Sequence, residues 1–163
     1  MPTASSSTTF TTPTDREVVA TRMFDAPREL VWDAVTKPEH LRQWMLGPDG
    51  WEMPICEIDL QPGGAYRYGW AEAGTGANPF ELSGEFREID PPERIVHTEQ
   101  FGGEGPEAII TLELVEEAGK TRMTTTMLYP SKEIRDQVLE TGMTEGAGKS
   151  YDRLADYLDG LGD

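Results

Sequence analysis

The chain has 163 residues, 37% of them hydrophobic, and this length suits one compact domain with a core of its own. Its 30 acidic residues outnumber 14 basic ones, and the formal net charge of −16 repels nucleic-acid phosphates and anionic lipid surfaces. Neither nucleic acid nor a membrane is therefore expected as a partner. The acidity itself is interpreted as a feature that keeps the protein soluble.

Cysteine content and the first residues indicate a cytoplasmic protein. Cys56 is the single cysteine, so no internal disulfide can form, and a reducing cytoplasm is the expected location. The first residues are rich in Ser and Thr and lack the basic start and apolar stretch of a secretory signal. Residues 1–14 are predicted to be a disordered tail, and residues 15–163 to form a single domain.

Periodicity and turn residues predict a strand, two short helices, six further strands and a long final helix. After a strand over 17–24, Asp25 and Pro27 supply a cap and a first-turn proline for a helix that ends near Val35. A second short helix opens at Pro38. The six further strands are expected at about 53–60, 65–70, 80–89, 95–101, 107–115 and 121–129. Their short, turn-rich links favour an antiparallel meander.

The last segment, from Ser131 to about Leu158, has apolar residues at mostly helical spacing and is long enough to cover a seven-stranded sheet. Gly142, Gly146 and Gly148 each cost a helix about 1 kcal/mol relative to Ala. Two explanations remain open and carry equal weight. Gly142 and Gly146 share a face and leave room for a ligand or a close approach to the sheet, or the helix breaks within 141–148.

A hairpin over residues 59–70 predicts an aromatic sheet face. Pro62 and Gly63 reverse the chain, and the alternation of Tyr66, Tyr68 and Trp70 then places three rings on one side of the returning strand. A helix must cover that face, either packed directly on it or held away from it by a cavity.

The chain resembles the heat-shock protein 90 ATPase activator homologue family. Four segments in the same order carry the resemblance: FDAPRELVW at 24–32, the turn at 59–64, GEFREIDPPERIV at 84–96, and Gly142-Met143 followed by Gly146. The resemblance covers about 16–161 and places the chain in the START-like (SRPBCC) helix-grip superfamily. It implies an α+β fold in which a curved antiparallel sheet of about seven strands wraps around a long C-terminal helix, with two short helices closing one end.

The resemblance also implies a hydrophobic cavity between sheet and helix, which the superfamily uses to bind lipids, hormones, polyketides or aromatic compounds. Some members catalyse cyclisation or hydrolysis there. Family members often carry Trp where this chain has Ala147, and the smaller side chain should enlarge the space. The candidate ligand-binding residues are Trp44, Trp51, Tyr66, Tyr68, Trp70, His97, Glu99, Phe101, Met123, Thr125, Met127, Met143 and Ala147. Alternatively, the aromatic and methionine side chains are ordinary core, or a register shift turns Val96 and Thr98 inward.

Three functions remain open from the sequence. The first is binding of a small hydrophobic or aromatic molecule, without a cofactor. The second is an enzyme of the cyclase or hydratase type, in which Glu99 raises the basicity of His97 and makes it a general base. The third, suggested by the family name alone, is a chaperone-linked interaction module. With two histidines and one cysteine, no metal site is expected, and a homodimer is left open.

Overall fold

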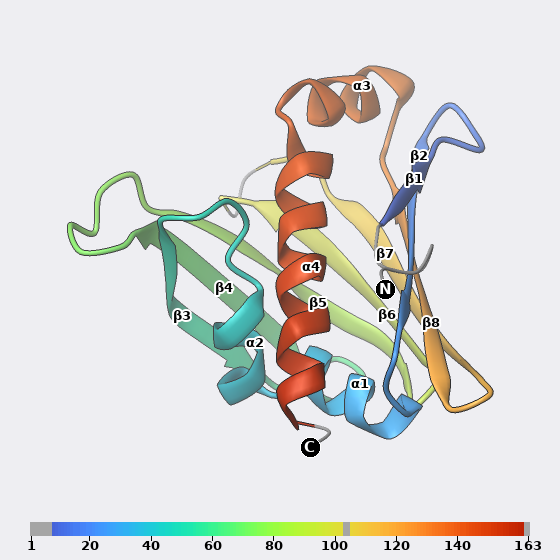
Figure 1. Cartoon of the computed structure of the whole chain (residues 1–163). Helices are drawn as coiled ribbons and strands as arrows, with labels where there is room; N and C mark the ends of the chain where they lie inside the picture. The colour runs from blue at the N-terminus through green and yellow to red at the C-terminus, as the bar shows by residue number, and fades with distance from the viewer. Residues whose placement is uncertain (1–7, 103–104, 162–163) are drawn as a thin grey trace.

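The computed structural model describes residues 8–102 and 105–161, which form eight strands and four helices. In Figure 1 a curved antiparallel sheet wraps around the long C-terminal helix. The strands are β1 (Thr9–Thr11), β2 (Glu17–Phe24), β3 (Trp51–Ile58), β4 (Ala65–Glu72), β5 (Phe80–Asp90), β6 (Arg94–Phe101), β7 (Ala108–Glu117) and β8 (Lys120–Leu128). The helices are α1 (Arg28–Thr36), α2 (Pro38–Trp44), α3 (Lys132–Glu140) and α4 (Met143–Leu161).

The strand order β1-β2-β8-β7-β6-β5-β4-β3 is a meander closed by the N-terminal strands, which pair with the last strand. The expected α+β helix-grip architecture is confirmed, with eight strands where about seven were expected. The additional strand is β1, in which Thr9 pairs with Thr21 and Thr11 with Val19 of β2. The predicted disordered tail is therefore wrong at Thr9–Thr11, because pairing there covers the free edge of β2. Residues 1–7 lie outside the described residues.

The C-terminal segment is two helices where one was predicted. The Oγ of Ser131 accepts a hydrogen bond from the Ile134 N–H at 3.2 Å and caps α3. The break falls at Gly142, whose φ of +82° is one that L side chains rarely adopt. Of the two explanations offered for the glycines, the helix break is therefore the correct one for Gly142. Gly146 and Gly148 remain inside α4, where an added Cβ would meet Pro48 at 3.5 Å and Phe10 at 3.8 Å.

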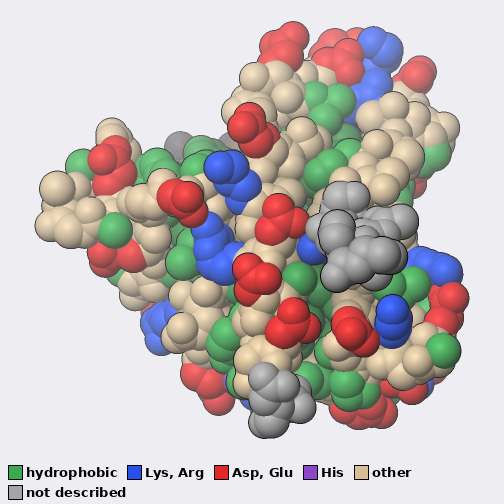
Figure 2. All heavy atoms as spheres, viewed as in Figure 1, with side chains coloured by type: hydrophobic (Ala, Val, Ile, Leu, Met, Phe, Trp, Pro, Cys, Tyr) green, Lys and Arg blue, Asp and Glu red, His purple; other side chains and the backbone are tan. Residues whose placement is uncertain are grey.

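The end of the fold that α1 and α2 close is a tightly packed hydrophobic core. Seven side chains from β2, α1, α2, β7, β8 and α4 are at most 2% exposed there: Phe24, Val31, Leu41, Leu114, Met123, Leu154 and Leu158. The Trp44 indole N–H donates to the Ala34 carbonyl at 2.8 Å and ties α2 to α1. The solvent side of α4 carries Asp152, Asp156 and Asp159, and Figure 2 shows acidic side chains along that helix. None of the described helices has both the length and the apolar composition needed to cross a membrane.

Candidate ligand site on the concave face

Three aromatic rings of β4 lie on the sheet face that is turned toward α4. The ring centroids of Tyr66 and Tyr68 are 4.8 Å apart, and those of Tyr68 and Trp70 are 6.1 Å apart. From β6, the His97 ring meets Tyr66 edge-on at 4.9 Å. The strand register therefore turns His97 and Glu99 toward the helix, and the alternation in β4 places its rings on the same concave face.

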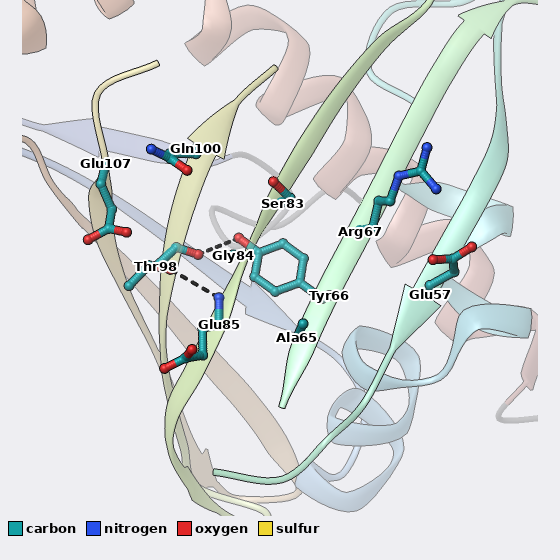
Figure 3. A pocket seen from close by; sticks show the side chains of 10 residues that line it. All are labelled: Glu57, Ala65, Tyr66, Arg67, Ser83, Gly84, Glu85, Thr98, Gln100 and Glu107. Atoms are coloured by element: carbon teal, nitrogen blue, oxygen red, sulfur yellow. Dashed lines mark hydrogen bonds between the residues drawn. The ribbon is translucent and has the colours of Figure 1, made fainter. Parts of the chain in front are cut away.

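The Tyr66 side chain crosses the neighbouring strand. Its hydroxyl donates to the Thr98 carbonyl of β6 at 2.5 Å and passes Gly84 of β5 on the way. A Cβ at Gly84 would lie 2.8 Å from Tyr66 Cε1 and 2.0 Å from the Thr98 oxygen, so only glycine fits at this point. The Glu85 N–H donates to Thr98 Oγ1 at 3.0 Å (Figure 3), and the β5–β6 register shifts a short way beyond. The ladder is thus opened locally around a tyrosine hydroxyl.

His97 is held neutral beside this opening. Its Nδ1 lies 3.0 Å from the Thr98 carbonyl oxygen and 3.0 Å from Tyr66 Oη. A carbonyl can only accept, so Nδ1 carries the proton and Nε2 is left as an acceptor. Burial lowers the pKa of His97, and its bond to Thr98 only partly offsets this. The expectation that Glu99 raises the basicity of His97 is wrong, because desolvation dominates and favours the neutral ring.

Glu99 is the central charge-bearing group of the concave face. It pairs with Ala108 of β7, so a small side chain lies beside it. Burial raises the pKa of Glu99 to about 7. Its negative charge contributes to the raised pKa of the hydroxyls of four tyrosines, in each case as a smaller cause than burial: Tyr66, Tyr68, Tyr129 and Tyr151.

Three polar groups on this face lie below the protein surface but are not fully enclosed by packed atoms. The Glu99 carboxylate, the Tyr68 hydroxyl and His97 Nε2 make no hydrogen bond within the described residues. Each of these side chains is half-buried. The only described side-chain nitrogens or oxygens that are fully enclosed without a partner belong to Arg22 and Arg28. The three groups therefore border space that a water molecule can reach.

The first half of α4 forms the other wall. Met143, Ala147 and Tyr151 follow one another at four-residue spacing and are all half-buried. Tyr151 Oη lies 3.5 Å from Thr125 Oγ1 of β8, and the Tyr151 ring lies 6.2 Å from Trp44. Met127, also expected to line the site, is buried in a small cluster with Tyr129 beneath α3. This part of α4 thus faces the sheet with one small side chain between two larger ones.

Aromatic residues form a rim beside the site. Trp70 and Phe101 stack on Phe80 at centroid distances of 5.2 and 5.6 Å, and Trp51 meets Phe80 edge-on at 5.5 Å. The Trp70 indole N–H donates to the Met45 carbonyl at 2.7 Å, and Phe101 is 59% exposed. Of the other candidates, Trp44 and Met123 lie in the tightly packed hydrophobic core, where packing and not ligand contact explains them.

Sequence reasoning missed Tyr129, Tyr151 and Gly84. Tyr129 continues the alternation of Met123, Thr125 and Met127, so extending the β8 pattern by one step would have found it. Tyr151 lies one helical turn after Ala147 and could have been found by the same spacing. Gly84 carries no comparable signal, because its need for glycine arises from a contact between different strands.

A separate hollow of about 540 Å³ lies on the opposite, convex side of the sheet (Figure 3). It covers the opened ladder, and its walls include Arg67, Glu85, Thr98, Gln100 and Glu107. Arg67 is held by Glu81 through two hydrogen bonds of 2.7 and 2.9 Å. This hollow is charged and faces away from α4, so it differs in place and chemistry from the apolar cavity expected between sheet and helix.

The antiparallel sheet curled around one long helix defines a helix-grip protein of the α+β class. The model of the family "Activator of Hsp90 ATPase homolog 1-like protein" matches residues 25–159, and the chain belongs to this family. A search of curated proteins gives no match.

Solved structures with the same fold include a protein from Rhodobacter sphaeroides, 27% identical with a TM-score of 0.86, covering 94% of this chain and 99% of that one. A protein from Nitrosomonas europaea is 26% identical with a TM-score of 0.81, covering 92% and 98%. DynU16, a protein of the dynemicin biosynthetic locus, is 27% identical with a TM-score of 0.64. That match covers 90% of this chain and 48% of DynU16.

Proposed function

We propose that the protein binds a small hydrophobic or aromatic molecule between the concave face of the sheet and the first half of α4. The observation that carries the proposal is the group of deep, unsealed polar atoms on Tyr68, His97 and Glu99, surrounded by aromatic side chains. A predominantly apolar wall with a few convergent polar groups is the usual composition of a small-molecule site. Polar groups left without partners in an interior are costly unless water or a ligand satisfies them.

The route into the site is proposed to run past the aromatic rim. The loop after α2 is tied to α4, because the Gly47 N–H donates to Ser150 Oγ at 2.8 Å and Arg153 donates to the Gly47 carbonyl at 3.1 Å. Phe101 and Trp51, in contrast, are held mainly by ring contacts with Phe80. An exposed phenyl ring such as that of Phe101 offers an incoming apolar molecule its first contact.

The match to DynU16 agrees with this proposal, because that protein is encoded in a biosynthetic locus. A chaperone partner, in contrast, rests on the family description alone. Relatives of one fold commonly differ in function, so the proposal depends on the site of this chain and not on its family.

Native mass spectrometry of the protein purified from its own host tests the proposal. We expect a bound species that is released on denaturation and identified as an aromatic or apolar compound. The matched variant is Ala147→Trp, which should fill the space and lose the bound species while keeping its circular dichroism spectrum. If the host protein carries no compound and a panel of aromatic compounds does not bind at millimolar concentration, the proposal fails.

Glu99 also favours a second candidate, an enzyme of the cyclase or hydratase type. An acid with a pKa of about 7 beside a neutral His97 is suited to donate a proton near neutral pH. In this candidate Glu99 is the general acid, whereas the sequence predicted His97 as a general base. Incubating the extracted compound with the protein and looking for a product tests this candidate. Turnover that falls as pH rises through 7 and is lost in Glu99→Gln would support it, and turnover unchanged in that variant would exclude it.

A further inference from the structure

Glu99 is an acid without a cation of its own. Among residues 8–102 and 105–161, no Lys, Arg or His forms an ion pair with it. Burial is also the sole cause found for the shift of its pKa, so no nearby positive charge offsets it. A carboxylate in such a place is costly unless it takes up a proton or meets a cation from outside the protein.

The groups around Glu99 are suited to a cation and poorly suited to an anion. The charge of Glu99 acts on Tyr66 and Tyr68 of β4, on Tyr129 directly after β8, and on Tyr151 of α4. Aromatic rings attract ammonium groups through the negative charge of their faces, and groups of such rings bind substituted ammonium ligands. His97, two residues earlier on the same strand, is neutral because burial lowers its pKa.

The net charge of the molecule also favours a cationic ligand. With a net charge of −16, the protein attracts cations and repels anions. Acidic side chains lie along α4 on the face shown in Figure 2, next to the wall of the site. A fatty acid or another carboxylate would have to approach against this field and then lie beside a second carboxylate.

We infer that the ligand of the concave site is an apolar or aromatic molecule that carries a basic amine, with the ammonium group bound to Glu99 among the four tyrosines. This inference rests on the proposed function and specifies the ligand class for the same site. It predicts that affinity follows the ionisation of Glu99. Of the groups that face it, the tyrosine pKa values are raised and the His97 pKa is lowered, so Glu99 alone titrates near neutral pH.

A charge series on one scaffold provides the test. The full chain is titrated calorimetrically with 3-phenylpropylamine, 3-phenylpropan-1-ol and 3-phenylpropanoate, and the same three end groups are also carried on a larger naphthyl scaffold. At about pH 8 we expect the amine to bind about ten-fold more tightly than the alcohol, with the carboxylate weakest. At about pH 6 most of Glu99 is protonated, so affinity for the amine should fall about ten-fold while affinity for the alcohol stays constant.

Matched variants test whether Glu99 causes the preference for the amine. Glu99→Gln should bind amine and alcohol equally, whereas Glu85→Gln, the same change on the convex face, should keep the preference for the amine. In unsubstituted protein, NMR titration of the Glu99 side chain should show its pKa falling when the amine binds and unchanged with the alcohol. This readout does not depend on a variant folding.

The outcomes separate the two proposals. If the alcohols bind and the amines bind no more tightly, or if Glu99→Gln keeps the preference, the amine inference is overturned and the binding function stands. If none of the six compounds binds and the host protein carries no compound, both are overturned.

Discussion

The two halves of α4 meet the same sheet in different ways. In the second half, Leu154 and Leu158 are at most 2% exposed and pack against α1, α2 and the adjoining strands. In the first half, Met143, Ala147 and Tyr151 are half-buried and face a region that holds Glu99 and His97. One end of the grip is therefore filled by aliphatic side chains, while the other end is bordered by polar groups without partners.

This difference separates a part of α4 that packs in the core from a part that borders the proposed site. A close-packed end can orient the helix while the other end stays incompletely filled, because packing contributions are local and need not extend along the whole helix. Both short helices, α1 and α2, pack against α4, and the second half of α4 carries its most deeply buried side chains, Leu154 and Leu158.

The largest effect is expected in the filled half. Leu154→Ala removes a side chain with no exposed surface and should lower the free energy of unfolding by about 4 kcal/mol, since the cavity cannot collapse fully. Met143→Ala in the other half should lower it by about 1 kcal/mol, because Met143 is half-buried. Urea denaturation measures both. Equal losses would mean that the two halves are packed alike.

The next effect concerns pH and Glu99. Its pKa is raised to about 7 by burial, so the folded state holds a proton that the unfolded chain releases. The stabilisation that protonated Glu99 gives the folded state is fully present below the pKa of Glu in the unfolded chain. It is lost as pH rises through 7, which lowers the free energy of unfolding by about 3 kcal/mol in total.

Between about pH 5 and about pH 8, urea denaturation should show the unsubstituted protein losing this stability relative to Glu99→Gln. The lowered pKa of His97 favours folding as pH rises in the same window, but it is common to both proteins, so their difference isolates Glu99. The lowered pKa values of Glu81 and Asp136 act at more acidic pH, outside this window. A decline of the same size in the variant would show that another group is responsible.

A third effect concerns the space itself. Ala147→Trp should lower the affinity for aromatic compounds at least about ten-fold and change the free energy of unfolding by less than about 1 kcal/mol, because the indole enters unfilled volume. Fluorescence titration and urea denaturation measure the two quantities. A loss of stability of several kcal/mol would show that α4 already packs directly on the sheet at this position.

The smallest effect is expected at the opened ladder. Tyr66→Phe removes the donor to the Thr98 carbonyl and should cost about 1 kcal/mol. Tyr129→Phe is the matched control, because among the described residues that hydroxyl donates to the weak acceptor Met127 Sδ at 3.8 Å, and its loss should cost less than about 0.5 kcal/mol. If the two variants lose the same free energy of unfolding, the hydrogen bond from Tyr66 to Thr98 stabilises the protein no more than the Tyr129 contact does.

Local patterns predicted the fold class and part of the site. The alternation of Tyr66, Tyr68 and Trp70 was sufficient to place them on one face, because side-chain direction in a strand has a fixed period of two. The long C-terminal helix is confirmed as α4, but its expected start at Ser131 was wrong, since the positive φ at Gly142 separates α3 from α4. Strand β1 was missed because a Ser- and Thr-rich segment has little strand signal until a free edge is present to pair with it.

The sequence by itself determined the order of the elements and the faces of the inner strands, because periodicity and turn chemistry are local properties. Only the tertiary structure decided that Tyr66 passes Gly84 to reach Thr98 and that His97 stays neutral. It also decided that the charge of Glu99 acts on four tyrosines from three separate segments. These features depend on burial and on contacts between residues far apart in the chain, and both exist only once the sheet has curved around α4.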